Sequence, residues 1–210
     1  MSRGRGGINV VGVGEAGAPP DIMLIDIGVS IRADTVAEAS TGARESAATL
    51  METLTGAGVA KGDLATTGYT VYPEYDHRDG EQRLLGYRVS NELRITLRDL
   101  EGAGEILDRG MAAAGDAVMV NRLLFAVEDE TGPRDQAREA AWRDALARAE
   151  HLARLAGRSL GPAVSIDESP GLAPGPRPLA RMAAMAESAT PIEPGTATVK
   201  VTLQVRFELA

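Results

Sequence analysis

Strict alternation of apolar and polar residues in three long segments is the feature that most constrains this chain. Apolar residues occupy the odd positions of 23–31, and the same alternation returns in 85–97 and 199–209. Successive side chains of a β-strand point to opposite faces, so each segment predicts a strand with one buried and one solvated face. Such strands are typical of antiparallel sheets, whereas strands of a parallel sheet are apolar on both faces. The pattern therefore excludes a doubly wound parallel fold.

Helical segments separate these strands from shorter strand candidates. The first predicted helix opens with Thr35 and Glu38 at the spacing of a capping box and ends near Gly56. The second follows Asp99 as its N-cap and stops at Gly115. Four shorter segments also predict strands: 8–13, 65–75, 118–127 and 163–166.

A third predicted helix follows Thr131-Gly132-Pro133, where proline suits the first turn, and runs to Gly157. Small side chains recur along one of its faces, which lets a helix lie close to a sheet or to another helix. Trp142 lies beside this stripe, and core packing explains it better than a cofactor site does. The stripe consists of Ala137, Ala141, Ala145, Ala149 and Leu152.

Together these elements predict an α+β fold with a largely antiparallel or mixed sheet of amphipathic strands, covered by about three helices. We expect residues 1–7 to be a flexible N-terminus and 8–210 to form one domain. Within it, 169–194 is rich in Pro, Gly, Ala and Met and predicts a mobile loop, with a short helix at 179–187 as one alternative.

Composition excludes several classes of function. The formal net charge is −8 with arginines scattered among carboxylates, and aromatic residues make up only 3% of the chain, so nucleic-acid binding is not expected. The absence of cysteine removes disulfides, thiolate metal sites and thiol nucleophiles. No run of about 18 apolar residues is present, so no membrane span is expected. The start of the chain lacks an apolar signal segment, which predicts a cytoplasmic protein; the alternative is a cell-envelope or secreted protein whose leader was removed.

Two short motifs resemble catalytic or cofactor fingerprints but lack their structural context. The segment from Gly12 to Gly17 matches the dinucleotide pattern, yet a strand rather than a helix follows it, so a β-turn is the expected structure. The segment from Gly157 to Gly161 matches a nucleophile elbow, but both histidines precede Ser159, and Gly157 is better explained as the end of a helix.

The densest group of titratable residues lies within 72–77. A carboxylate–histidine metal site or an acid–base pair would use such residues, but the chain has only two histidines, on different predicted elements. The neighbouring run from Asp76 to Gly80 has the composition of a hairpin turn, which favours a structural interpretation. The group consists of Tyr72, Glu74, Tyr75, Asp76 and His77.

Ordered motifs along the chain resemble the SIMPL-domain family. They run from about residue 8 to residue 168, the final strand also fits, and their order is more specific than any single motif. They include Gly12-Val13-Gly14-Glu15, Thr67-Gly68-Tyr69, Tyr72-Pro73-Glu74-Tyr75, Gly86-Tyr87-Arg88-Val89-Ser90-Asn91, Phe125-Ala126-Val127 and Ala156-Gly157. The resemblance implies an α+β domain with no established catalytic residues. It also implies kinship with bacterial envelope proteins, some linked to oxidative stress or seen as oligomers, and with a mammalian relative that interacts with a kinase.

The sequence therefore predicts a non-catalytic structural or interaction protein that self-associates, by isologous contacts or by ring closure. No catalytic, cofactor-binding or metal-binding residue is assigned, and no cofactor is expected. The expected partner is a second copy of the chain or another protein. The alternatives are a small-molecule binding module with a cleft beside the loop 169–194 and, ranked below it, a hydrolase that uses the group Tyr72–His77.

Overall fold

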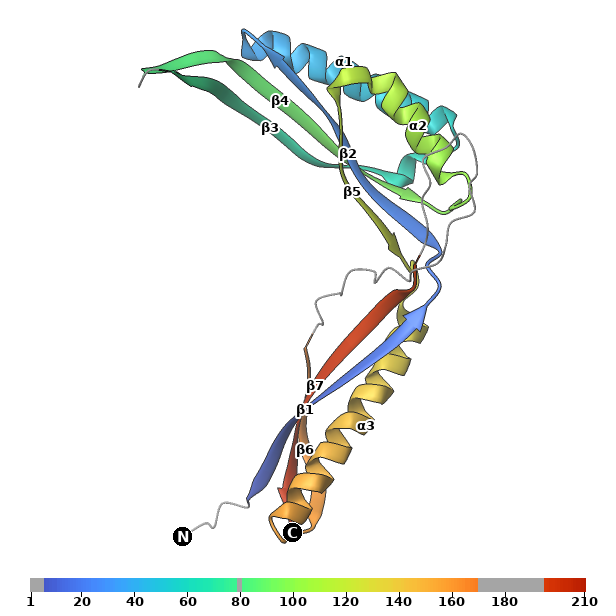
Figure 1. The fold of residues 1–210 in the computed structure, drawn as a ribbon. Coiled ribbons are helices and arrows are strands. Elements are labelled where there is room, and N and C mark those ends of the chain that lie inside the picture. Colours follow the sequence, from blue (N-terminus) through green and yellow to red (C-terminus); the bar gives the residue numbers. More distant parts are fainter. Residues whose placement is uncertain (1–5, 79–80, 170–194) are drawn as a thin grey trace. The chain divides into compact units, whose positions relative to one another are not determined.

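The computed structural model describes residues 6–78, 81–169 and 195–210 of the 210-residue chain. Within them lie seven strands, three α-helices and two short 3-10 helices (Figure 1). In chain order these are β1 (Gly7–Ala18), β2 (Ile22–Ala33), α1 (Val36–Gly56), η1 (Lys61–Asp63), β3 (Leu64–Arg78), β4 (Glu81–Leu97), α2 (Ala103–Ala114), η2 (Gly115–Ala117), β5 (Val118–Ala126), α3 (Thr131–Leu155), β6 (Leu160–Ser169) and β7 (Ala197–Leu209).

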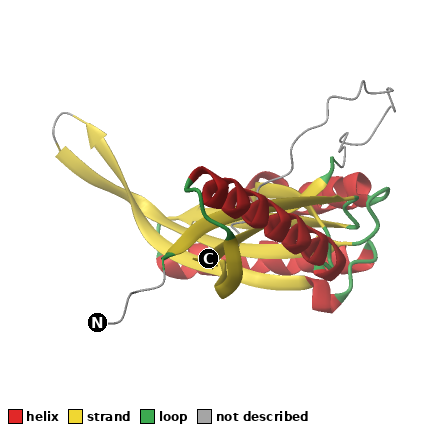
Figure 2. Ribbon diagram, turned by 90° about the horizontal axis from the view of Figure 1, so that it is seen from below, coloured by secondary structure: helices red, strands yellow, loops and turns green. Residues whose placement is uncertain are grey.

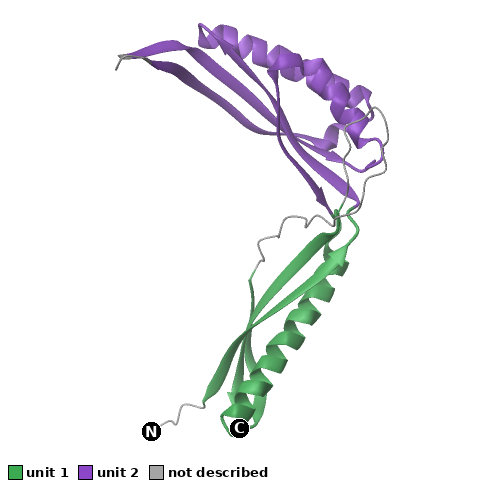
Figure 3. Ribbon diagram, viewed as in Figure 1, with its two compact units in different colours: residues 1–20, 127–180, 195–210 green, residues 21–126, 181–194 purple. Residues whose placement is uncertain are grey.

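The elements form two compact units (Figure 3). Among the described residues, 6–20, 127–169 and 195–210 form unit 1, and 21–78 and 81–126 form unit 2. Each unit contains its own sheet, and every strand pair in both sheets is antiparallel. The predicted α+β class and antiparallel pairing are therefore confirmed, with the strands divided between two sheets.

The segments predicted to be flexible fall largely outside the described residues. Residues 1–5 and 170–194 are not described, and the predicted short helix at 179–187 lies among them. Two residues of the segments predicted to be flexible lie in strands. Gly7, the last residue of the segment 1–7, begins β1, and Ser169, the first residue of the segment 169–194, ends β6. The extent of a single domain over 8–210 stays a prediction.

Unit 2 has the order β-α-β-β-α-β, and its four strands lie in the order β3-β4-β2-β5. This combination is the split βαβ arrangement known from ferredoxin-like folds. Helices α1 and α2 pack against each other and against one face of the sheet (Figures 1 and 2). The opposite face carries the polar half of each alternating strand, and we call it the open face.

Large aliphatic side chains fill the space between this sheet and its helices. The odd positions of β2, from Met23 to Val29, are almost completely buried, as are Leu50 and Leu54 of α1. Burying a side chain of this size contributes about 2–3 kcal/mol each, so this cluster stabilises unit 2.

The ends of the unit 2 helices agree with the sequence in one case and differ in the other. The Thr35 side chain accepts a hydrogen bond from the backbone N–H of Glu38, as predicted for a capping box. Helix α2 begins three residues later than predicted, after Gly102. The backbone N–H of Gly102 donates a hydrogen bond to Asp99 Oδ1 at 3.0 Å. Asp99 therefore closes the turn before the helix instead of serving as the N-cap of α2.

Unit 1 is a three-stranded sheet in the order β1-β7-β6, with α3 packed along β1 and β7. The first and last strands of the chain pair along their whole length, from Gly7 opposite Glu208 to Ala18 opposite Ala197. The side chains of α3 that face this sheet are fully or almost fully buried alanines: Ala137, Ala141, Ala145, Ala149 and Ala153. Ala153, and not the predicted Leu152, completes the stripe, because Leu152 points to solvent.

The β-turn predicted for Gly12–Gly17 is wrong, because these residues continue β1. Gly12 and Gly14 face α3 in an extended strand, and neither has a positive φ. A Cβ atom on Gly12 would lie 2.1 Å from the Ala141 carbonyl oxygen, and one on Gly14 would lie 2.0 Å from that of Ala137. These glycines are therefore required by the close approach of the helix and not by backbone conformation.

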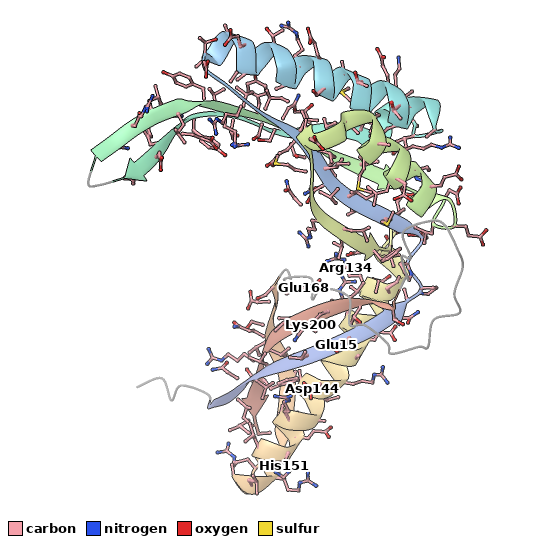
Figure 4. The ribbon with its side chains drawn as sticks, turned by 45° about the horizontal axis from the view of Figure 1, so that its top comes forward. Glu15, Arg134, Asp144, His151, Glu168 and Lys200 are labelled. Atoms are coloured by element: carbon pink, nitrogen blue, oxygen red, sulfur yellow. The ribbon has the colours of Figure 1, made fainter. Side chains whose placement is uncertain are left out.

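Asp144 of α3 makes a further contact with β1, which is an edge strand of its sheet. Its Oδ2 accepts a hydrogen bond of 2.9 Å from the backbone N–H of Val13 in β1 (Figure 4). A side chain from α3 thus satisfies a donor of an edge strand, which protects that edge from pairing with other chains. Gly157, with φ 64°, ends the helix as predicted.

Candidate functional site

The structure does not gather the group Tyr72–His77 into one site. These residues lie on β3, whose alternation places Tyr72, Glu74 and Asp76 on one face and Tyr75 and His77 on the other. A metal or acid–base site would require His77 and the carboxylates to converge, and the strand turns them apart. The hairpin turn predicted for 76–80 is wrong for 76–78, because these residues continue β3 and pair with β4 up to Arg78 opposite Glu81; residues 79 and 80 lie outside the described residues.

Glu74 instead belongs to a polar network on the open face. The Arg88 guanidinium donates a hydrogen bond to the Glu74 carboxylate and lowers the pKa of the Glu74 carboxyl below the ordinary value. Arg32 Nε lies 3.7 Å from Glu74 Oε2. Arg88 also donates to Ser30, whose hydroxyl lies 3.1 Å from that of Ser90. The lowered pKa favours the ionised form of Glu74, which is the anionic partner of Arg88 in this network.

A second ion pair on the open face joins the two central strands. Arg94 of β4 donates two hydrogen bonds to Asp26 of β2, at 2.7 and 3.1 Å, and these bonds lower the pKa of the Asp26 carboxyl. Both partners lie directly opposite each other in the β2–β4 register. We interpret these pairs as cross-strand contacts that hold the sheet together.

The most unusual surface of unit 2 is the extension of β3 and β4 beyond the rest of the sheet. The last pair between β2 and β4 is Ala33 with Tyr87, so residues 74–78 and 81–86 form a two-stranded projection that we call the arm (Figures 1 and 2). A register shift at Glu74/Tyr75 and the positive φ of Gly86, 138°, mark its base. A Cβ atom on Gly86 would lie 2.4 Å from the Ala33 carbonyl oxygen, so the chain needs glycine there.

Large apolar side chains are exposed on the arm and on the adjoining part of β3. Tyr75 and Leu84 are cross-strand partners and are 46% and 45% exposed. Tyr69 and Val71 continue the same face and are also exposed, because α1 lies over β2 and β4 and not over β3. These four residues, which we call the arm face, form an apolar surface with no cover among the described residues of this unit.

Unit 1 contains a second uncovered apolar region, between α3 and the edge strand β6. Helix α3 packs over β1 and β7 but touches β6 only slightly, which leaves a groove of about 450 Å³. Its floor consists of Trp142, Leu203 and Ile166, and Ile166 is 56% exposed although it lies on the helix side of the sheet. The Trp142 ring is held in place by Phe207, with ring centroids 5.9 Å apart.

Charged side chains border this groove, which we call the Trp142 groove. Arg138 donates two hydrogen bonds to Glu168, at 2.7 and 3.1 Å, and this contact lowers the pKa of the Glu168 carboxyl (Figure 4). Glu139 and Arg143 also border the groove, and Arg143 donates only to the Glu139 backbone carbonyl, at 3.4 Å. The rim therefore holds one closed ion pair and one further charge of each sign.

Comparison with known proteins assigns the chain to a family. The family SIMPL, described as a protein of unknown function (DUF541), matches residues 8–207. The chain belongs to the SIMPL family. The resemblance found in the sequence motifs is thereby confirmed.

The SIMPL chain is also similar to two groups of curated bacterial proteins. It is 33% identical to the "26 kDa periplasmic immunogenic protein" of Brucella melitensis over 217 residues, which covers 96% of this chain and 84% of that protein. It is 32% identical to the "Uncharacterized protein YggE" of Escherichia coli K12 over 155 residues, or 74% of this chain and 62% of that protein. The Brucella relative is named as a periplasmic protein, which does not support the cytoplasmic location that we expected from the sequence.

Neither apolar surface of this SIMPL chain was found from the sequence. The signal for the arm was the length of the paired strands, since β3 and β4 have 15 and 17 residues whereas β2 has 12. The groove had a weaker signal, the apolar Ile166 in a short strand next to a proline-rich segment. Over the described ranges 6–78, 81–169 and 195–210, no three His, Asp or Glu side chains converge as metal ligands, and no helix is long and apolar enough to cross a membrane.

Proposed function

We propose that this SIMPL chain is a non-catalytic structural or interaction protein that self-associates through the arm face. The observation that carries the proposal is the joint exposure of Tyr69, Val71, Tyr75 and Leu84 on one side of a projecting hairpin. A two-stranded ribbon is at best marginally stable in water, and its apolar face gains stability when another surface covers it. A second copy of the chain can supply such a surface, to an extent that the protein concentration determines.

The proposed place of action is the cell envelope. Support comes from the Brucella relatives, which are named periplasmic and match 96% of this chain. The absence of cysteine is compatible with an oxidising compartment, because no thiol is present to form mixed disulfides.

A non-catalytic role agrees with the arrangement of the titratable residues. Glu74 is held ionised by Arg88, and His77 points to the opposite face of β3. Replacement of His77 by Ala is therefore judged by turnover and not by association, because His77 lies on the same face of the arm as Tyr75. A hydrolytic activity that disappears in His77→Ala would contradict this part of the proposal.

Solution mass tests self-association directly. Light scattering coupled to size exclusion should give a mass above the 22.0 kDa of one chain at micromolar concentration. Leu84→Ser and Tyr75→Ser should weaken association by about tenfold or more, because each removes a large apolar contact from the interface. Leu155→Ser is the matched control, since Leu155 is 71% exposed but lies on α3 of unit 1, whereas the arm belongs to unit 2. A monodisperse mass of 22.0 kDa at all concentrations would refute self-association.

A small-molecule binding module is the second candidate, and the Trp142 groove favours it. The groove has an apolar floor, a volume of about 450 Å³ and polar groups at its rim, which are features of ligand sites. Anilinonaphthalene sulfonate, a flat apolar anion, can probe it, because Trp142 is the only tryptophan and reports binding through its fluorescence. Saturable quenching that Ile166→Ser abolishes and Leu155→Ser leaves unchanged would support this candidate; equal quenching in all three proteins would reject it.

A further inference from the structure

Two apolar surfaces of opposite shape, one on each unit, have no cover among the residues that the structure describes. The arm is a projecting two-stranded ribbon with Tyr75 and Leu84 on one face. The Trp142 groove is a concave surface with Ile166 and Leu203 in its floor. We propose that the arm of one copy occupies the Trp142 groove of a second copy. This inference rests on the proposed self-association and names the contact through which it occurs.

The arm is suited to insertion because it stands clear of the rest of its sheet. Past Ala33 and Tyr87 it has no third strand, so both of its faces are accessible along residues 74–78 and 81–86. Tyr75 and Leu84 lie directly opposite each other, and together they form a compact apolar head about two side chains wide. An aromatic residue of this kind, buried in a pocket, is the usual anchor of a protein interface.

The groove offers an apolar floor where the arm needs one. On the helix side of the sheet, Ile166 occupies a position that would be core if α3 reached β6. Ile166 is exposed, and it lies in the groove beside Trp142, so no described element packs over this part of the sheet. An inserted hairpin would cover it and would bury Tyr75 and Leu84 at the same time.

The charges around the two surfaces permit the contact. Arg138 is neutralised by Glu168 and Asp135, which leaves Glu139 and Arg143 at the rim, one charge of each sign. Asp76 and Arg83, a cross-strand pair beside Tyr75 and Leu84, bring one charge of each sign as well. With Asp135 counted, the groove rim holds three carboxylates and two guanidinium groups, and residues 74–78 and 81–86 of the arm also hold three acidic and two arginine residues. Each surface therefore has a small acidic excess, so the contact depends on apolar burial and allows pairing of opposite charges only at its edge.

Contact between two different surfaces has a consequence for the assembly. An arm-to-groove contact joins two different surfaces. Two copies that exchange arms reciprocally close as a dimer, whereas a copy that uses its arm on one neighbour and its groove on another makes a heterologous contact. Repetition of this contact closes into a ring or continues as a filament. A contact between two arm faces would instead be isologous and would end at a dimer.

The absence of cysteine from the chain allows a specific cross-linking test. Leu84→Cys and Ile166→Cys, prepared as separate proteins of which one is tagged, are mixed and oxidised with diamide. We expect a mixed disulfide between the two proteins in about tenfold excess over the mixture of Leu84→Cys with the control Leu155→Cys, because docking raises the local thiol concentration. Cross-links of Leu84→Cys to itself without a mixed product, or equal yields with both partners, would overturn the inference.

Fluorescence of the unmodified protein provides a second, independent readout. If the arm of a neighbour covers Trp142, dilution should shift the emission of this single tryptophan to longer wavelength as the assembly dissociates. Leu84→Ser should show the long-wavelength emission at every concentration, and Leu155→Ser should behave like the unmodified protein. Assembly seen by light scattering without this shift and without the mixed disulfide would reject the arm-to-groove contact and leave self-association standing. A monomer at all concentrations would reject both.

Discussion

The two units use the same architecture, helices on one face of an antiparallel sheet, but they fill the interface between helix and sheet in opposite ways. In unit 2, Leu50 and Leu54 of α1 meet large aliphatic residues of β2 and β4. In unit 1, five alanines of α3 meet a strand that carries Gly12 and Gly14. The helix–sheet interface of unit 2 is filled by large side chains, whereas that of unit 1 is close-packed because its side chains are small or absent. The two interfaces should therefore be sensitive to substitutions of opposite kinds.

Leu50→Ala should have the largest effect. Leu50 is fully buried between α1 and its sheet, so the truncation leaves a cavity and should lower the free energy of unfolding of unit 2 by about 2–5 kcal/mol. Thermal unfolding followed by circular dichroism measures the loss. The matched control Met51→Ala removes a similar volume from an exposed position of the same helix and should cost far less. Equal losses for the two variants would contradict the account of unit 2.

Gly14→Ala should have the second-largest effect and should lower the free energy of unfolding of unit 1. The added methyl group would overlap the Ala137 carbonyl oxygen at 2.0 Å, and relief of this overlap should cost about 1–3 kcal/mol as α3 moves away from β1. Trp142 lies on α3, so its fluorescence follows the unfolding of this unit. Gly17→Ala adds the same group to an exposed position of β1 and serves as the control. A gain in stability from Gly14→Ala would show that the helix does not lie this close to the strand.

The smallest effect is expected from the hydrogen bond between Val13 and Asp144. This bond, with a second one from Arg148, lowers the pKa of Asp144 below its ordinary value of 3.8. The ionised carboxylate therefore stabilises the folded state above this value, and the contribution is lost as pH falls through the lowered pKa. Asp144→Asn should cost roughly 1 kcal/mol or less at pH 7, because the side chain is partly exposed, and the difference from the unmodified protein should vanish at low pH. Asp116→Asn, at an exposed position of η2, is the control and should leave the free energy of unfolding at pH 7 nearly unchanged.

Much of the fold could be predicted from the sequence because the alternating strands carry their own signal. The odd apolar positions of β2 and the capping box at Thr35 are local patterns, and both were confirmed. Gly12 and Gly14 were misread because a glycine that makes room for a helix looks the same in sequence as one that makes a turn. Their reason lies in Ala137 and Ala141, which are more than a hundred residues away in the chain.

The two apolar surfaces escaped prediction for a related reason. Apolar residues such as Tyr75 and Ile166 fit the pattern of buried strand positions, and only the placement of α1 and α3 decides that they stay uncovered. Sequence periodicity reports which face of a strand is apolar. It does not report how far a helix extends across that face.

The pairing of β1 with β7 also determines when each unit can form during synthesis. The segment 21–126 holds all the described helices and strands of unit 2 and can fold as soon as it has left the ribosome. Strand β1 emerges first of all, yet its partner is the last strand to be made, so the completion of unit 1 depends on contacts of very high sequence separation. Until then the glycine-rich strand β1 lacks its strand partner, and only a truncation that removes the whole segment 197–209 would take that partner away.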